Sequence, residues 1–186
     1  MGLIIGIDLA YAHPIGFCQM QINGRHDTSA LKPPRKSDTI WTRQANVLQT
    51  VMATIGSGDL VLIEGYAFSA RSSSDAPLKE LGGLVRHAVL ERTGTYPIVV
   101  APALLKKFAT GKGNCKKDLI LLEVFARWGE RFTDDNAADA YVLARIGLAL
   151  VTKPTLPKFQ QECVKKLLDS LHVSQLARVA ARGLDR

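Results

Sequence analysis

The chain is poor in cysteine, and the three cysteines that it has stand far apart in its 186 residues. Cys18, Cys115 and Cys163 form no CxxC pair, so the sequence indicates neither a structural zinc site nor a disulfide framework. It also lacks any run approaching the roughly eighteen consecutive apolar residues that a membrane span requires. The first residues, MGLIIGIDLA, contain no basic leader and read as a buried strand. We therefore expect an intracellular, cytoplasmic protein with no membrane association.

Phosphate-binding loops of the common nucleotide-binding types are also missing. The glycine-rich segment GKGNCKK at 111–117 matches neither the Walker A pattern nor GxGxxG. The four histidines, at 13, 26, 87 and 172, show no metal-ligand spacing. The sequence thus predicts no nucleotide cofactor, and the histidines do not indicate a metal centre.

Positive charge is in excess. Lysine and arginine outnumber aspartate and glutamate by 24 to 17, which gives a formal net charge of +7. The basic residues concentrate at 32–36, 106–117, 153–166 and 178–186. Such a balance favours a polyanionic partner such as nucleic acid, although general solubility would explain it equally well.

Apolar periodicity predicts an α/β fold. Strands are expected at 3–10, 15–22, 59–66 and 96–102, with 23–40 as a loop or an irregular third strand. Helices are expected at about 42–55, 75–92, 102–109, 117–128 and 134–151. This order implies a mixed sheet whose first strands form an antiparallel meander, with flanking helices. The composition changes after residue 151, so we predict a main domain at 1–151 and a basic helical appendage at 152–186.

Two acidic residues interrupt or end apolar strands. Asp8 lies within the run at 3–10, where an ionised carboxylate is costly unless it is paired or bound to a metal. Glu64 ends the run VLIE and is followed by Gly65. Adjacent parallel strands would bring both acids to the sheet edge where α/β proteins build sites. The simpler alternatives are an Asp that caps a turn and a Glu that leaves the sheet for solvent.

Further acids lie in the segment DDNAADA at 134–140. In a helix, Asp135 and Asp139 are four residues apart and share a face, with Asn136 on nearly the same face. The helix dipole and an N-cap would explain Asp134 and Asp135, but they explain Asp139 poorly. Several carboxylates converging on one spot are what a two-metal phosphodiesterase needs, because Mg²⁺ takes oxygen ligands.

These motifs resemble those of the RuvC-type Holliday junction resolvases of the RNase H-like superfamily. The matching segments are GID at 6–8, IE at 63–64, TGKGNCKK at 110–117 and the acidic motif ending in ADA at 138–140. The resemblance spans about residues 3–150 and implies an RNase H-like nuclease domain. It also implies a homodimer that binds four-way DNA junctions in recombination and repair and cuts them by paired nicks. Two Mg²⁺ ions per site are expected, with Mn²⁺ as a substitute.

The resemblance also assigns roles to individual residues. Asp8, Glu64 and Asp139 match the family's metal ligands, and Lys117 matches its active-site lysine, which would stabilise charge developing at the phosphate. DNA contacts are expected from the lysines of the basic loop and from the segment after the central glutamate, where aromatic residues probe the junction centre. These candidates are Lys112, Lys116, Lys117, Tyr66, Phe68 and Arg71, with core packing as the alternative for Phe68.

The sequence departs from the family's pattern at two places. Leu9-Ala10 replaces Pro-Gly after the first aspartate, and Asn136 occupies the position of the fourth carboxylate. Asp135 would reach the same metal from a slightly rotated helix, so we predict it as the fourth ligand and a catalytic residue. The DDNxAD form looks closer to phage-encoded or divergent members, which act in the host cytoplasm. The helix at 75–92, with Gly82-Gly83, is the expected dimer interface.

Two other functions stay open on the sequence. The replacement of an acid by Asn136 would suit a non-catalytic junction-binding protein. An RNase H-like nuclease that acts on flaps or RNA–DNA hybrids would use the same carboxylates.

Overall fold

A five-stranded mixed sheet organises the computed structural model, which describes residues 2–10, 13–31, 39–65 and 75–183. The strands, in the spatial order β3-β2-β1-β4-β5, are β1 (Ile4–Asp8), β2 (Ile15–Met20), β3 (His26–Leu31), β4 (Leu60–Glu64) and β5 (Ile98–Val100). Strands β1, β2 and β3 form an antiparallel meander, whereas β1, β4 and β5 are parallel. The predicted mixed sheet is confirmed, and the uncertain segment at 23–40 contains a regular strand.

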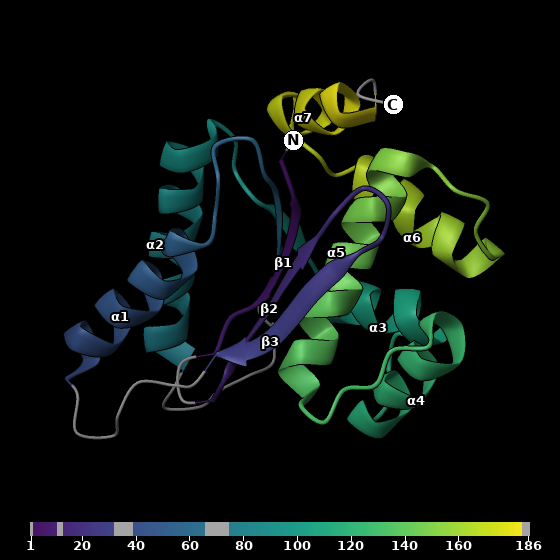
Figure 1. The fold of residues 1–186 in the computed structure, drawn as a ribbon, viewed down its shortest axis with the longest axis horizontal. Helices are drawn as coiled ribbons and strands as arrows, with labels where there is room; N and C mark the ends of the chain where they lie inside the picture. The colour runs from purple at the N-terminus through teal and green to yellow at the C-terminus, as the bar shows by residue number, and fades with distance from the viewer. Residues whose placement is uncertain (1, 11–12, 32–38, 66–74, 184–186) are drawn as a thin grey trace.

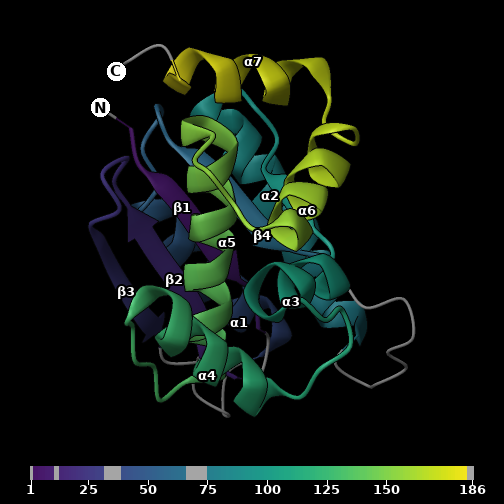
Figure 2. The same cartoon turned by 90° about the vertical axis from the view of Figure 1, so that its right-hand side faces the viewer.

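Helices cover both faces of the sheet (Figures 1 and 2). On one face lie α1 (Ile40–Ala53) and α2 (Asp75–Thr93). On the other lie α3 (Pro102–Thr110), α4 (Lys117–Trp128), α5 (Asp135–Thr152) and α6 (Lys158–Leu168), while α7 (Val173–Gly183) crosses one end of the molecule. Among the described residues, no helix has the length and apolar character needed to cross a bilayer.

Side chains of the central strands alternate between two cores. In β1, Ile5 and Ile7 enter the core beneath α1 and α2, whereas Ile4 enters the core beneath α5. The parallel neighbour β4 follows the same alternation in register with β1. Because successive residues of a strand point to opposite faces, Asp8 and Glu64 both point toward the α5 face at the carboxyl ends of their strands.

Helix α5 lies directly against the sheet at glycine positions. A Cβ atom on Gly6 of β1 would overlap the carbonyl oxygen of Ala140, and one on Gly16 of β2 would overlap that of Asn136. The helix is buried along most of its length, as its alanine-rich sequence permits. This close approach fixes the distance between α5 and the strand ends that carry Asp8 and Glu64.

Gly6→Ala is expected to destabilise the protein by about 3 kcal/mol, the upper end of the usual cost of overpacking, because backbone atoms of α5 cannot yield to the new methyl group without moving the helix. Gly58→Ala is the matched control, since a Cβ there would meet its nearest atom, the Cα of Gly2, at 3.5 Å, an ordinary van der Waals contact. Urea unfolding of the two variants measures the difference. A Gly6→Ala protein as stable as the control would contradict the close packing.

The carboxyl-terminal helices pack on the preceding residues. Cys163 and Leu167 of α6 and Val179 of α7 belong to the core beneath α5. The guanidinium of Arg178 donates hydrogen bonds to the carbonyl oxygens of Ser57 and Thr93, near the amino ends of β4 and β5. Helices α6 and α7 thus pack on the rest of the chain, while the boundary at 151 and the separate appendage at 152–186 stay predictions.

Candidate metal centre

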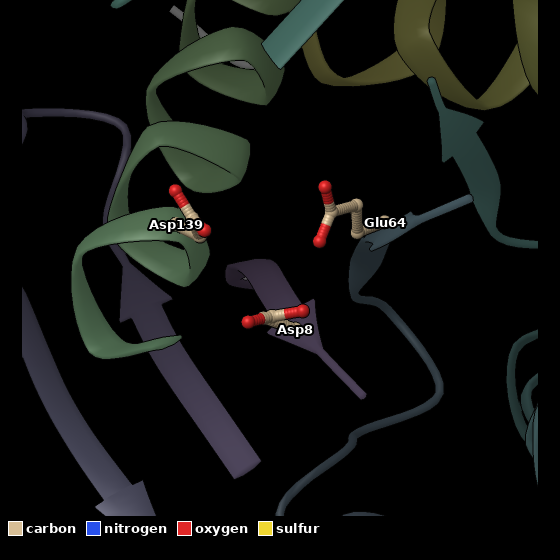
Figure 3. A group of neighbouring side chains, drawn as sticks. All are labelled: Asp8, Glu64 and Asp139. Carbon is tan, nitrogen blue, oxygen red and sulfur yellow. The ribbon is translucent and has the colours of Figure 1, made fainter. Parts of the chain in front are cut away.

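Three of the predicted acidic residues meet at the carboxyl ends of β1 and β4. Asp8 from β1, Glu64 from β4 and Asp139 from α5 each offer an oxygen atom, and these atoms lie within 4.8 Å of one another (Figure 3). The parallel register that pairs Ile7 with Ile63 places the two strand acids side by side. The contact of α5 with Gly16, the residue opposite Asp8 on β2, brings the first turns of this helix over the strand ends.

Burial and mutual repulsion make this site unfavourable for three ionised carboxylates. Asp8 and Asp139 are each only 8% exposed. Burial raises the pKa of Asp8 well above its usual value, and the charge of Glu64 raises it further. Burial followed by the charge of Glu64 raises the pKa of Asp139 from 3.8 to about 7. Burial also raises the pKa of Glu64, although a hydrogen bond with Asp8 and two nearby lysines oppose the shift.

An unsatisfied oxygen supports a cation at the same place. Oδ1 of Asp139 is buried and has no hydrogen-bond partner among the described residues. Buried polar atoms are rarely left without a partner unless an ion or water completes the site. Oxygen donors of negative charge are the ligands that Mg²⁺ and Mn²⁺ prefer. The three carboxylates therefore fit a hard divalent cation, which would both neutralise their repulsion and engage the unpaired oxygen.

The fourth predicted ligand lies beside this cluster rather than in it. Oδ2 of Asp135 lies 3.3 Å from Nζ of Lys117, the first residue of α4. Partial burial acts to lower the pKa of Lys117, but its hydrogen bond and attraction to Asp135, with the charges of Asp139 and Asp8, raise the pKa overall. Lys117 is thus held as a cation at the rim of the acidic cluster, and Asp135 holds it there.

Asn136 has a structural partner. Its Nδ2 donates a 2.6 Å hydrogen bond to the carbonyl oxygen of Pro14, in the connection between β1 and β2. The side chain therefore ties α5 to this connection while Asp135 pairs with Lys117. The position where the sequence departs from the family's acidic motif is occupied by a residue that binds the backbone.

The predicted DNA contacts divide into two groups. Lys112 and Lys116 are exposed in the loop between α3 and α4. Tyr66, Phe68 and Arg71 lie outside the described residues, so their roles stay predictions.

Sequence reasoning missed Lys106 of α3, whose charge lowers the pKa values of Glu64 and Asp139. It lies in the basic stretch at 106–117, but nothing in that stretch distinguishes it from its neighbour Lys107, which pairs with Glu162 of α6.

Comparison with known proteins finds likeness in structure. No family model matches the chain, and no curated protein matches it in sequence. The Thermus thermophilus RuvC structure matches with a TM-score of 0.59 at 20% identity, covering 76% of this chain and 90% of that one. T. thermophilus RuvC in complex with a Holliday junction substrate matches with a TM-score of 0.58 at 15% identity, covering 77% and 90%. The chain therefore has the RuvC-like, RNase H-like fold that its motifs predicted.

Proposed function

We propose that this protein is a divalent-metal-dependent endonuclease that resolves four-way DNA junctions by paired nicks. The convergence of Asp8, Glu64 and Asp139 within 4.8 Å carries the proposal. A structurally similar protein, T. thermophilus RuvC, has been solved with a Holliday junction substrate. The net charge of +7 and the exposed lysines beside the site support a nucleic-acid substrate.

The site residues would divide the chemistry between them. Asp8, Glu64 and Asp139, with Asp135 at the margin, would hold two Mg²⁺ ions, or Mn²⁺ in their place. Such ions supply an activated water nucleophile and stabilise the leaving oxygen. Lys117, held as a cation by Asp135, is placed to stabilise negative charge on the phosphate at the rim of the cluster.

Other residues would bind and position the DNA. Lys112 and Lys116 would neutralise phosphates of the DNA backbone, a contribution that depends on salt concentration. Tyr66, Phe68 and Arg71 remain our candidates for the junction centre. Asn136, in place of an acid, was the argument for a protein that binds junctions without cutting them. Its hydrogen bond to the carbonyl oxygen of Pro14 explains this asparagine by a structural role, so it is no evidence that the site has lost a metal ligand. The contact therefore favours a nuclease over a binding protein.

A homodimer would supply the two active sites that paired nicks need. We propose α2 as its interface, because Leu84 is 44% exposed and the adjacent Gly83 faces open space. Leu84→Glu is expected to shift the protein from dimer to monomer in light scattering, while leaving its circular dichroism unchanged. A wild-type protein that is monomeric at micromolar concentration would refute the dimer.

The proposal is tested by a nicking assay on four DNA substrates. Equal concentrations of a synthetic four-way junction, a flap, an RNA–DNA hybrid and a linear duplex compete for the enzyme in Mg²⁺, Mn²⁺ or EDTA. Preferential, symmetric nicking of the junction that requires the metal supports the proposal. Junction binding without nicking would indicate a binding protein, and preferred cutting of the flap or hybrid would indicate a different nuclease of this fold.

Asp135→Asn and Asn136→Ala are expected to separate catalysis from stability. Asp135→Asn removes the partner of Lys117, so nicking should slow about tenfold or more and need more Mg²⁺, while stability changes by less than about 1 kcal/mol because the ion pair is exposed. Asn136→Ala leaves the Pro14 carbonyl without its donor and should lower the free energy of unfolding by about 1–3 kcal/mol. Mg²⁺ titrations of nicking and urea unfolding measure both. The reverse pattern would make Asn136 the metal-site residue.

A further inference from the structure

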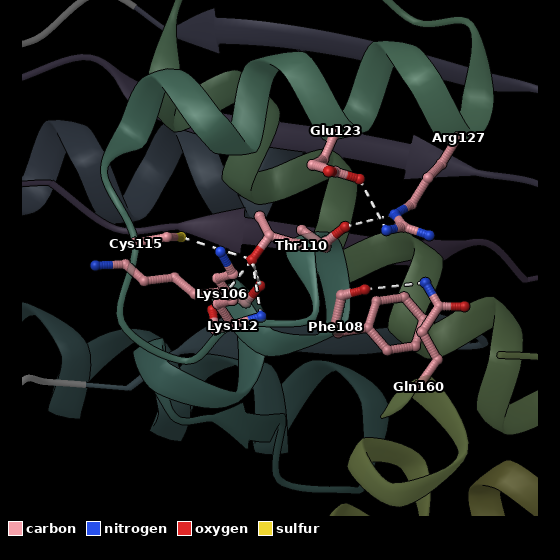
Figure 4. Close-up of polar contacts among 9 residues, drawn as sticks. Lys106, Phe108, Thr110, Lys112, Cys115, Glu123, Arg127 and Gln160 are labelled. Carbon is pink, nitrogen blue, oxygen red and sulfur yellow. Dashed lines mark hydrogen bonds and ion pairs between the residues drawn. The ribbon is translucent and has the colours of Figure 1, made fainter. Parts of the chain in front are cut away.

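The basic loop at 110–117 begins at the carboxyl end of α3, where main-chain carbonyls need partners outside the helix. Thr110 organises the first turn of the loop (Figure 4). Its hydroxyl donates to the carbonyl oxygen of Lys106 at 2.9 Å and accepts the main-chain N–H of Lys112 at 3.1 Å. Gly111 continues in the left-handed conformation, with φ of 80°, and its N–H donates to the carbonyl oxygen of Lys107. The conformation at Lys112 therefore depends on how the end of α3 is held.

Two side chains from other helices donate hydrogen bonds to carbonyl oxygens in the last turn of α3. Nε2 of Gln160, from α6, donates to the carbonyl oxygen of Phe108 at 2.9 Å. Nε of Arg127, from α4, donates to that of Ala109 at 2.8 Å, and Glu123 holds the same guanidinium at 2.8 Å. Figure 4 shows these contacts side by side at the end of α3. Gln160 is only 4% exposed, so its amide has no access to water as an alternative partner.

Phe159, the neighbour of Gln160, supports the loop from the same helix. Its ring carbon Cγ lies 3.9 Å from the position that a Cβ on Gly111 would occupy. The guanidinium of Arg127 lies 5.0 Å from the centre of the ring, within the range of a cation–π contact. Phe159 and Arg127 therefore enclose the point where α3 ends and the basic loop begins.

We infer that Gln160 and Phe159 are positioning residues for the DNA-binding loop, through which α6 orients Lys112 and Lys116. The inference rests on the proposed function, because it assigns these lysines to DNA phosphates. Helix α6 would thus contribute to DNA binding, although it lies after residues 3–150, which carry the sequence motifs. Neither Gln160 nor Phe159 belongs to the acidic cluster, so substitutions of these residues should change the affinity for DNA.

The test compares Gln160→Leu with the matched control Gln161→Leu in the full-length protein. Gln161 is the adjacent exposed glutamine of α6, and its Nε2 donates to Leu156 instead of α3. The dissociation constant of a synthetic four-way junction is measured in EDTA over a series of salt concentrations. Gln160→Leu is expected to weaken binding about tenfold and to reduce the salt slope by roughly 1–2, because each lost phosphate contact removes about 0.9. Gln161→Leu should retain the wild-type affinity and slope.

The salt slope separates positioning from folding. A variant that is merely less stable has fewer active molecules, which raises the apparent dissociation constant by the same factor at every salt concentration and leaves the slope unchanged. If Gln160→Leu does not fold, the milder Phe159→Leu must show the same reduced slope. A wild-type slope in the folded variant overturns the inference. If the wild-type protein binds linear duplex but never nicks a junction, the proposed function fails, and the slopes on duplex still decide the role of α6.

Discussion

Asp8→Asn is expected to lower the rate of junction nicking at least about a thousandfold, the upper end of what losing one preorganised electrostatic contact costs in enzymes. An oxygen of Asp8 lies within 4.8 Å of those that Glu64 and Asp139 offer, so Asp8 would be one of the residues that hold the metal (Figure 3). Asparagine keeps the size of the side chain and removes its charge. Junction affinity in EDTA should change little, because we propose that the phosphate contacts come from the lysines at 112, 116 and 117 and not from the acids.

The same variant should gain stability without metal, which distinguishes loss of catalysis from loss of folding. Because burial and the charge of Glu64 disfavour ionised Asp8, a neutral side chain there removes a penalty at pH 8. Asp27→Asn, at an exposed position on β3 of the same sheet, is the matched control and should leave nicking and stability unchanged. Nicking by Asp8→Asn at the wild-type rate in Mg²⁺ would remove Asp8 from the mechanism.

The positions of Asp8 and Glu64 could be predicted from the sequence because they depend on the residues of their own strands. An acid at the end of an apolar strand has few favourable surroundings, and the alternation of side chains fixes the face to which it points. Asp8 and Glu64 could therefore be assigned to one sheet edge before the sheet was known. Asp139 was predicted from the same reasoning on a helix, since the dipole and the N-cap account for Asp134 and Asp135 but leave it unexplained.

What the sequence did not predict depends on contacts between distant segments. The partner of Asn136 is a carbonyl 122 residues away, and that of Gln160 is one 52 residues away. Every residue has a main-chain carbonyl, so the residue types in a sequence do not show which carbonyl accepts a given hydrogen bond. Neither bond could therefore be predicted from a sequence pattern. Lys106 and Lys107 are adjacent lysines, and only the orientation of α3 directs the charge of one to the acidic cluster and that of the other to Glu162.

These contacts suggest how the site tolerates its own charge. Lys106 and Lys117 lower the pKa of the buried acids from outside the cluster, yet burial still prevails for Asp8, Glu64 and Asp139. A protein that kept this arrangement only for stability would gain by neutralising one acid. The unfavourable electrostatics are therefore better understood as preparation for a cation, which favours all three carboxylates in their ionised form.

The metal-free protein is accordingly expected to lose stability as the pH rises from about 4 to about 7. Over this interval an unfolded chain has released the proton of Asp139, whereas the folded protein still holds it, because burial raises the pKa of this residue from 3.8 to about 7. The unfolded state then binds fewer protons, so the free energy of unfolding falls with pH and stays low above pH 7. The decrease from Asp139 alone is at most about 4 kcal/mol, and Asp8 and Glu64 change in the same direction.

Mg²⁺ should reverse this loss at pH 8 and have little effect at pH 4.5, because only ionised carboxylates bind the ion. At a hundred times its dissociation constant, a ligand of the folded state adds about 2.7 kcal/mol. Urea unfolding from pH 4.5 to 8.5, in EDTA and in Mg²⁺, measures both effects. Asp139→Asn should show a shallower pH dependence and a smaller response to Mg²⁺, while Asp27→Asn should follow the wild type. If Mg²⁺ stabilised Asp139→Asn as much as the wild type, the ion would bind elsewhere, and the acidic cluster would not be the metal centre.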